Sequence, residues 1–84
     1  MKQTIQDRLV AFLQSCGMKE VESRTRKYRT FESRAVPGQY YFLGKSGACR
    51  KGKGASKSLS ITDIMHKRLA VWEASQHRLD VPEA

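Results

Sequence analysis

Residues 43–54, LGKSGACRKGKG, place four glycines among four lysines and arginines, a pattern that could bind phosphate. Gly47-x-x-x-x-Gly52-Lys53 fits the first seven positions of the nucleotide phosphate-loop pattern G-x-x-x-x-G-K-[ST]. The eighth residue is Gly54, so the hydroxyl that would hold magnesium is missing. A phosphate loop also joins a buried parallel strand directly to a helix, whereas the next helical pattern begins several residues later. The stretch therefore favours a nucleic-acid contact or a solvated turn over nucleotide hydrolysis.

The basic residues gather in the middle of the chain. Residues 19–57 hold eleven Lys or Arg and three Glu, while the five basic and five acidic residues outside them cancel. The whole formal charge of +8 therefore falls in this window, as is typical of phosphate-binding surfaces, although a solvated basic face would give the same pattern. We predict phosphate contacts from a basic hairpin and a Gly/Lys-rich loop: Arg24, Arg26, Lys27, Arg29, Lys45, Arg50, Lys51, Lys53 and Lys57.

The remaining reactive side chains lack the spacing of a catalytic or metal site. Cys16 and Cys49 are 33 residues apart, with no C-x-x-C and no clustered His, so we expect no zinc site and no cofactor. His66 and His77 are eleven residues apart on one predicted helix, or roughly 16 Å along its axis, which is too far to share a metal or a proton. We expect both at exposed positions, and we expect a protein that is not an enzyme.

A helix is predicted near each end of the chain. Thr4 is a capping residue with Asp7 three positions on, and apolar residues then recur at helical spacing until Gly17, which predicts a helix over residues 5–16. The second helix is predicted to start with Ser60 as its cap. Its apolar stripe would face either the core or a partner groove: Ile61, Met65, Leu69 and Trp72.

Between the helices, short segments rich in β-formers predict strands at residues 18–22, 27–32 and 39–43, with a possible fourth at 48–51. Short connections favour antiparallel pairing. The expected fold is a single α+β domain over residues 1–79, with a three- to four-stranded antiparallel sheet and both helices on one face. A frayed acidic tail is expected over the last residues, 80–84.

Strand alternation would place Tyr40 and Phe42 on one face of the sheet, and Tyr41 and Leu43 on the other. Because one face must meet the helices, only one aromatic pair could be free. A free Tyr40 could stack an unpaired base, as single-strand binding platforms do.

The segment Gly52-x-Gly54-x-Ser56-Lys57, ahead of a C-terminal helix, resembles the G-x-G-x-S-K motif before the last helix of double-stranded-RNA-binding domains. That resemblance implies an α-β-β-β-α order, with Lys53 and Lys57 contacting phosphates across a groove. The first helix and strand also resemble RNA-cleaving toxins of the HicA type, which carry a catalytic His shortly after that strand. This chain has no His before residue 66, so the resemblance implies a scaffold without the cleavage chemistry.

The sequence thus predicts a small basic nucleic-acid-binding protein of low sequence specificity, because phosphates carry no base identity. RNA and DNA are equally open as partners. The alternative is a protein-interaction or assembly subunit, such as a bacterial or phage accessory protein or a homodimer. No run approaches the roughly 20 apolar residues of a membrane span, and no secretory signal is visible. We therefore expect a cytoplasmic protein that does not contact membranes.

Overall fold

The first helix, α1 (Ile5–Ser15), begins at the predicted residue and ends one residue before the predicted end, with Cys16 as its C-cap. The Asp7 amide donates to Thr4 Oγ1 at 3.1 Å, and the Thr4 amide donates back to the Asp7 carboxylate at 3.2 Å, which is a capping box. After the helix, Gly17 adopts a φ of +86°, the left-handed conformation that often ends helices. The computed structural model describes residues 3–23 and 25–80.

Five strands follow α1 and form one antiparallel sheet in sequence order, each strand paired with the next. A 3₁₀ turn, η1 (Ala55–Lys57), connects the last two strands, and a long helix, α2 (Thr62–Asp80), ends the described part of the chain. The strands are β1 (Lys19–Val21), β2 (Tyr28–Glu32), β3 (Tyr40–Gly44), β4 (Cys49–Gly52) and β5 (Ser58–Ser60).

The fold class is α+β as predicted, but the sheet has five strands instead of three to four. The additional strand, β5, contains one apolar residue between two serines, so its sequence lacks a strand signal. It forms because its backbone pairs with β4 over three residues. The prediction that Ser60 caps the last helix is wrong, since Ser60 belongs to β5 and α2 begins at Thr62.

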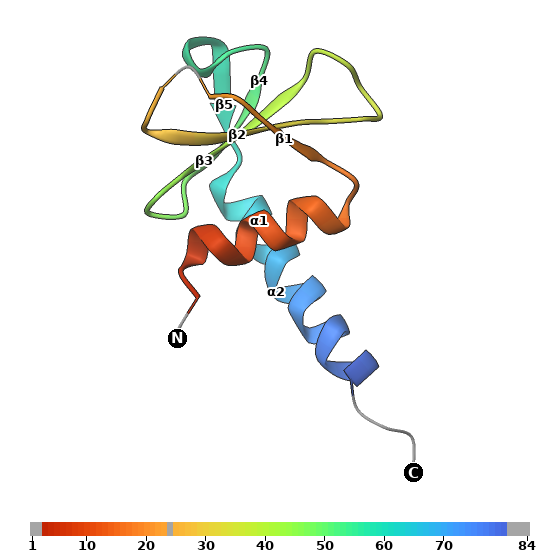
Figure 1. Ribbon diagram of the computed structural model, residues 1–84. Coiled ribbons are helices and arrows are strands. Elements are labelled where there is room, and N and C mark those ends of the chain that lie inside the picture. The colour runs from red at the N-terminus through yellow and green to blue at the C-terminus, as the bar shows by residue number, and fades with distance from the viewer. Residues whose placement is uncertain (1–2, 24, 81–84) are drawn as a thin grey trace.

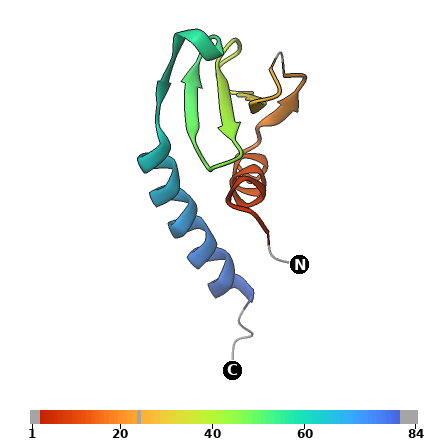
Figure 2. The ribbon, with the colours of Figure 1, turned by 90° about the vertical axis from the view of Figure 1, so that its left-hand side faces the viewer.

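Both helices pack on the same side of the sheet, as predicted (Figures 1 and 2). The core between them and the strands is fully enclosed at its centre, with Leu9 of α1, Phe31 of β2 and Leu43 of β3 each 0% exposed. Helix α2 contributes Met65 and Leu69, so its apolar stripe faces the core.

An ion pair also joins the two helices: Arg8 Nε donates to Glu73 Oε2 at 2.8 Å. In Figure 1 the C-terminal half of α2 extends away from the sheet.

The glycine-rich stretch forms a β-hairpin and the turn that follows it. Gly44 at the end of β3 pairs through its amide with the Ala48 carbonyl at 2.8 Å, and Gly47 closes the three-residue loop at a φ of +93°. A Cβ at Gly47 would lie 2.9 Å from Ile5 Cγ1. Two of the four glycines, Gly44 and Gly47, therefore form part of the hairpin. The neighbouring strands are antiparallel, unlike those around a phosphate loop.

Helix α2 reaches Asp80, one residue past the predicted domain boundary, and residues 81–84 of the predicted tail lie outside the described residues. Across residues 3–23 and 25–80, neither helix has an apolar stretch long enough to cross a membrane.

Candidate nucleic-acid interface

The sheet face opposite the helices carries three aromatic rings in contact. Tyr40 and Phe42 of β3 point away from the core, with ring centroids 6.4 Å apart, and Tyr28 of β2 lies 6.2 Å from Phe42. Tyr41 and Leu43 belong to the helix-covered side, so the predicted alternation is confirmed. Phe42 is only 6% exposed, whereas Tyr40 is half-buried, so Tyr40 presents side-chain surface to solvent beside a buried apolar neighbour.

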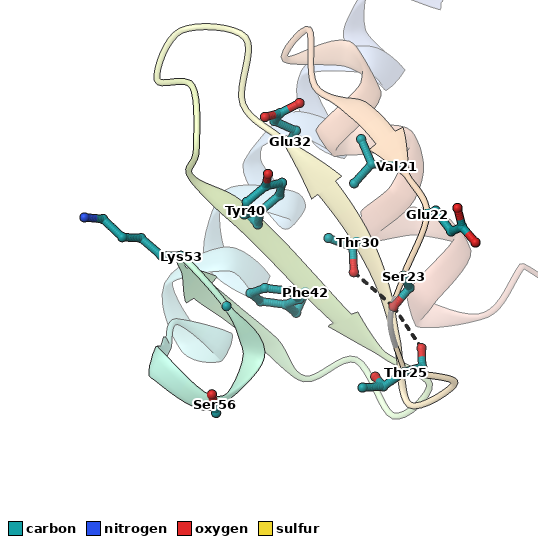
Figure 3. Close-up of a pocket in the computed structure, with 11 residues that line it drawn as sticks. Val21, Glu22, Ser23, Thr25, Thr30, Glu32, Tyr40, Phe42, Lys53 and Ser56 are labelled. Atoms are coloured by element: carbon teal, nitrogen blue, oxygen red, sulfur yellow. Dashed lines mark hydrogen bonds between the residues drawn. The ribbon is translucent and has the colours of Figure 1, made fainter.

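This open face is hollowed into a groove of about 720 Å³, which we call the open-face groove (Figure 3). Tyr40 and Phe42 lie along its floor, and the segments that follow β1 and β4 form its two walls. The residues that line it are Val21, Glu22, Ser23, Thr25, Thr30, Glu32, Tyr40, Phe42, Lys53, Gly54 and Ser56.

The wall that follows β1 is fixed to the floor by hydroxyl groups. Thr30 Oγ1 donates to Ser23 Oγ at 3.1 Å, and Ser23 Oγ donates to the Thr25 carbonyl at 2.8 Å (Figure 3). Thr30 is itself buried, at 7% exposure. These bonds tie the β1–β2 connection to β2, so the wall has a defined position over the aromatic floor.

The opposite wall depends on a close approach of backbone to backbone. A Cβ at Gly52 would lie 2.7 Å from both the Lys57 carbonyl and the Ser58 Cα, so only glycine lets the chain fold back against β4 here. Arg50 holds the returning chain, since its Nε donates to Ser58 Oγ and its second guanidinium nitrogen donates to the Ser58 carbonyl, both at 2.7 Å. Arg50 is thus engaged in positioning this wall.

Five of the nine predicted contact residues are exposed on the turns, where an extended polyanion could reach them. None of them takes part in the two ion pairs found in the described part of the chain. They are Arg26, Lys27, Lys45, Lys53 and Lys57. Arg24 lies outside the described residues.

Arg29 and Lys51 lie on the helix-covered side of the sheet, away from the open-face groove. Arg29 donates two hydrogen bonds to the Glu20 carboxylate, at 2.7 and 2.8 Å. Lys51 Nζ lies 5.7 Å from the centre of the Tyr41 ring, a cation–π contact. The nine predicted residues therefore do not share one face.

The exposed cations lie at both ends of the sheet. Tyr28 pairs with Gly44, so the turns carrying Arg26 and Lys45 share one end. Gly52 pairs with Tyr40 and Ser58, so Lys53 leaves the sheet at the other end. The open-face groove joins the two predicted segments, because Thr25 and Lys53 both line it.

Two carboxylates at the groove were not predicted as site residues. Glu32 pairs with Tyr40 across β2 and β3 and therefore lies beside the half-exposed ring. In Figure 3, Glu22 points outward from the wall that follows β1, while Lys53 extends outward on the opposite side. Strand alternation puts Glu32 and Thr30 on one face, but only the register shows that this face also holds Tyr40.

The remaining reactive side chains are held in the interior or at its margin. Burial raises the pKa of the Cys49 thiol to about 11, so it stays protonated at neutral pH. His66 is half-buried and its Nε2 lies 2.7 Å from the Gly47 carbonyl, so the prediction of an exposed position is wrong for this residue. The His77 side chain lies outside what the structure describes. No cluster of His, Cys, Asp and Glu within residues 3–23 and 25–80 is arranged to hold a metal.

Comparison with known proteins gives a partial likeness. No protein-family model matches the chain, and no solved structure matches it. The fibroblast growth factors 4A and 4B of Xenopus laevis are each 35% identical to this chain over 54 residues. That stretch is 64% of this chain but 28% of each growth factor, so the chain spans less than a third of the relatives it matches. The likeness does not place the chain in a family.

Proposed function

We propose that this protein is a small, non-enzymatic nucleic-acid-binding protein whose affinity comes from phosphate contacts at the turns around the open-face groove. The observation that carries the proposal is the placement of exposed cations on both sides of an aromatic-floored groove. Lys53 lines the groove, Lys57 directly follows the lining residue Ser56, and Arg26 and Lys27 directly follow the lining residue Thr25 on the opposite wall. Low sequence specificity follows from phosphate contacts.

The proposal predicts how steeply the affinity for nucleic acid falls with salt concentration. If the five exposed cations each contact one phosphate, log affinity falls with log salt at a slope of about −3.5 to −4.5. Between about 50 and 200 mM salt, the affinity would then fall roughly 100- to 500-fold. A solvated basic face that binds nothing would show no saturable binding at either salt.

The test is fluorescence anisotropy with labelled duplex RNA, duplex DNA and single strands, at salt concentrations from about 50 to 200 mM. Lys53→Glu/Lys57→Glu reverses two charges at the groove. The matched control, Lys67→Glu/Arg68→Glu, reverses two exposed charges on α2. Each substitution removes two units of charge, so both variants carry +4 instead of +8.

We expect the groove variant to lose at least about 10-fold in affinity at the lowest salt and to show a shallower salt slope, since about one unit of slope goes with each phosphate contact. The α2 variant should lose much less, because its charges lie on the other side of the sheet. Equal losses in the two variants would mean that net charge alone drives binding, and would contradict the groove as the site. Absence of binding to every probe at the lowest salt would overturn the function itself. Thermal melting of both variants verifies that they are folded.

The alternative, a protein-interaction subunit, is favoured by one observation. Between α1 and α2 the surface has an open apolar depression of about 440 Å³ beside Trp72, and the adjacent Val71 is 71% exposed. Exposed apolar surface of this kind is a common feature of partner contacts.

A cytoplasmic location belongs to the same proposal. Both cysteines are free thiols, which suits a reducing compartment.

A further inference from the structure

The open-face groove has the features of a site for a single unpaired base. This inference rests on the proposed function. We propose that the groove binds single-stranded nucleic acid by stacking one base on Tyr40. The hydrogen-bond donors of that base then lie at Glu32, which gives a preference for guanine. The phosphates on either side of this base then lie along the rim that carries Lys53 and Ser56.

The stacking surface is the partly exposed ring of Tyr40, which lies next to the buried ring of Phe42. Phe42 is 6% exposed and supports Tyr40 from the side, at 6.4 Å between ring centroids. Tyr40 keeps its own face half-exposed inside a groove of about 720 Å³, a volume within the range of small-ligand pockets. Base faces inside a duplex are covered by their neighbours, so only an unpaired base can use such a surface.

Charge then sets the orientation of the strand. Glu32 is half-buried beside Tyr40 and takes part in neither of the two ion pairs seen in the described residues. A carboxylate in that position repels phosphate, whereas Lys53 at the rim attracts it (Figure 3). The strand is therefore expected to run with its phosphates at the rim and a base turned inward.

The chemistry of a carboxylate also selects among the bases. An ionised carboxylate only accepts hydrogen bonds, and it does so with two oxygens. The Watson–Crick edge of guanine presents two adjacent donors, N1–H and the N2 amino group. Adenine and cytosine present one donor group on that edge, and uracil presents one N–H. Guanine therefore matches Glu32 best, and the matching pair gives specificity on top of phosphate-driven affinity.

The experiment measures binding of labelled RNA pentamers UUGUU, UUIUU and UUAUU, which are too short to form duplexes, together with a short RNA duplex. Inosine (I) lacks the N2 amino group of guanine. We expect the unmodified protein to bind UUGUU about 5- to 10-fold more tightly than UUAUU, with UUIUU between them. Tyr40→Ala should weaken pentamer binding about 10-fold or more, change duplex binding less than about 2-fold, and be rescued by Tyr40→Phe.

Glu32→Gln separates base recognition from simple charge. It should lower the affinity for UUGUU to about that for UUAUU, which abolishes the preference. The affinity for UUAUU should rise slightly, since a repulsive charge is gone. The matched control is Asp63→Asn, which makes the same charge change at an exposed residue in the first turn of α2, outside the groove lining, and should leave the preference intact.

Several results would overturn this inference while leaving the proposed function standing. One is a Tyr40→Ala loss that is equal for pentamers and duplex, and another is a base preference that survives Glu32→Gln. Failure of every probe, duplex included, to bind at about 50 mM salt would instead overturn the proposed function and this inference with it.

Discussion

The two faces of the sheet are built from the same strands, but one is covered by the helices and the other is open. On the helix-covered face, Phe31, Leu43 and Cys49 are each 0% exposed and join side chains of α1 and α2 in one apolar core. On the open face, the alternating positions of β2 and β3 hold polar or aromatic residues, namely Tyr28, Thr30, Glu32, Tyr40 and Phe42, and the surface is hollowed into a groove. Strand β3 contributes to both, because successive side chains point to opposite faces.

Phe42 shows how the open face keeps its shape without a helix to cover it. It is 6% exposed, nearly as buried as the core, yet it faces away from both helices. Its cover comes in part from the contacting rings of Tyr28 and Tyr40. The groove floor is therefore packed through local contacts alone, and we expect substitutions on the two faces to affect stability and binding separately.

The largest expected effect separates the faces by stability. Leu43→Ala removes a fully buried side chain from the core and should lower the free energy of unfolding by about 2–5 kcal/mol. Tyr40→Ala removes a half-buried ring from the open face and should lower it by about 1 kcal/mol or less. Chemical denaturation followed by circular dichroism measures both changes. If Tyr40→Ala destabilised as much as Leu43→Ala, the open face would be part of the stabilising core.

The second effect concerns the glycines of the groove wall. Gly52→Ala puts a Cβ 2.7 Å from the backbone of Lys57 and Ser58, so the wall must move, and we expect a loss of about 1–3 kcal/mol. Gly54→Ala meets nothing within 4 Å at a φ of −165° and should change stability by less than about 0.5 kcal/mol.

Denaturation midpoints compare the stability of the Gly52→Ala and Gly54→Ala variants, and RNA anisotropy compares their affinity for RNA. Equal stability of the two variants would mean that the chain does not need the close approach at Gly52 to form its wall.

The difference between the faces was only partly predictable from sequence. The Thr4 cap of α1, the chain reversal at Gly17 just after the helix and the alternation of residues 40–43 each depend on neighbouring residues, and the structure confirms all three. These are local features, for which spacing along the chain is sufficient.

What sequence could not supply was the register between strands. Three residues with one leucine give no signal for β5, which exists through its pairing with β4. The predicted cations were selected by charge alone, and the sheet then placed Arg29 and Lys51 on the helix-covered side. Glu32 was missed because only pairing with β3 brings it beside Tyr40.

The smallest expected effect lies at the margin of the covered face, where the apolar core gives way to an ion pair. Glu20 of β1 and Arg29 of β2 are joined at 2.7 Å, with side chains 37% and 39% exposed. The hydrogen bonds that Arg29 donates hold the pKa of the Glu20 carboxyl below its ordinary value. A lowered pKa in the folded state means that the pair stabilises the fold above the unfolded pKa, near 4.5, and that this contribution disappears as the pH falls through the lowered value.

Exposure and screening keep the Glu20–Arg29 contribution to at most about 1 kcal/mol. We therefore expect Glu20→Gln to lower stability slightly at pH 7 and to reduce the loss of stability on acidification below about pH 4.5, as measured by denaturation midpoints across pH. Glu22→Gln makes the same change of charge two residues along, outside both ion pairs, and serves as the control. If the two variants had the same acid profile, the Glu20–Arg29 pair would contribute nothing measurable, and the covered face would be stabilised by its apolar core without help from its polar margin.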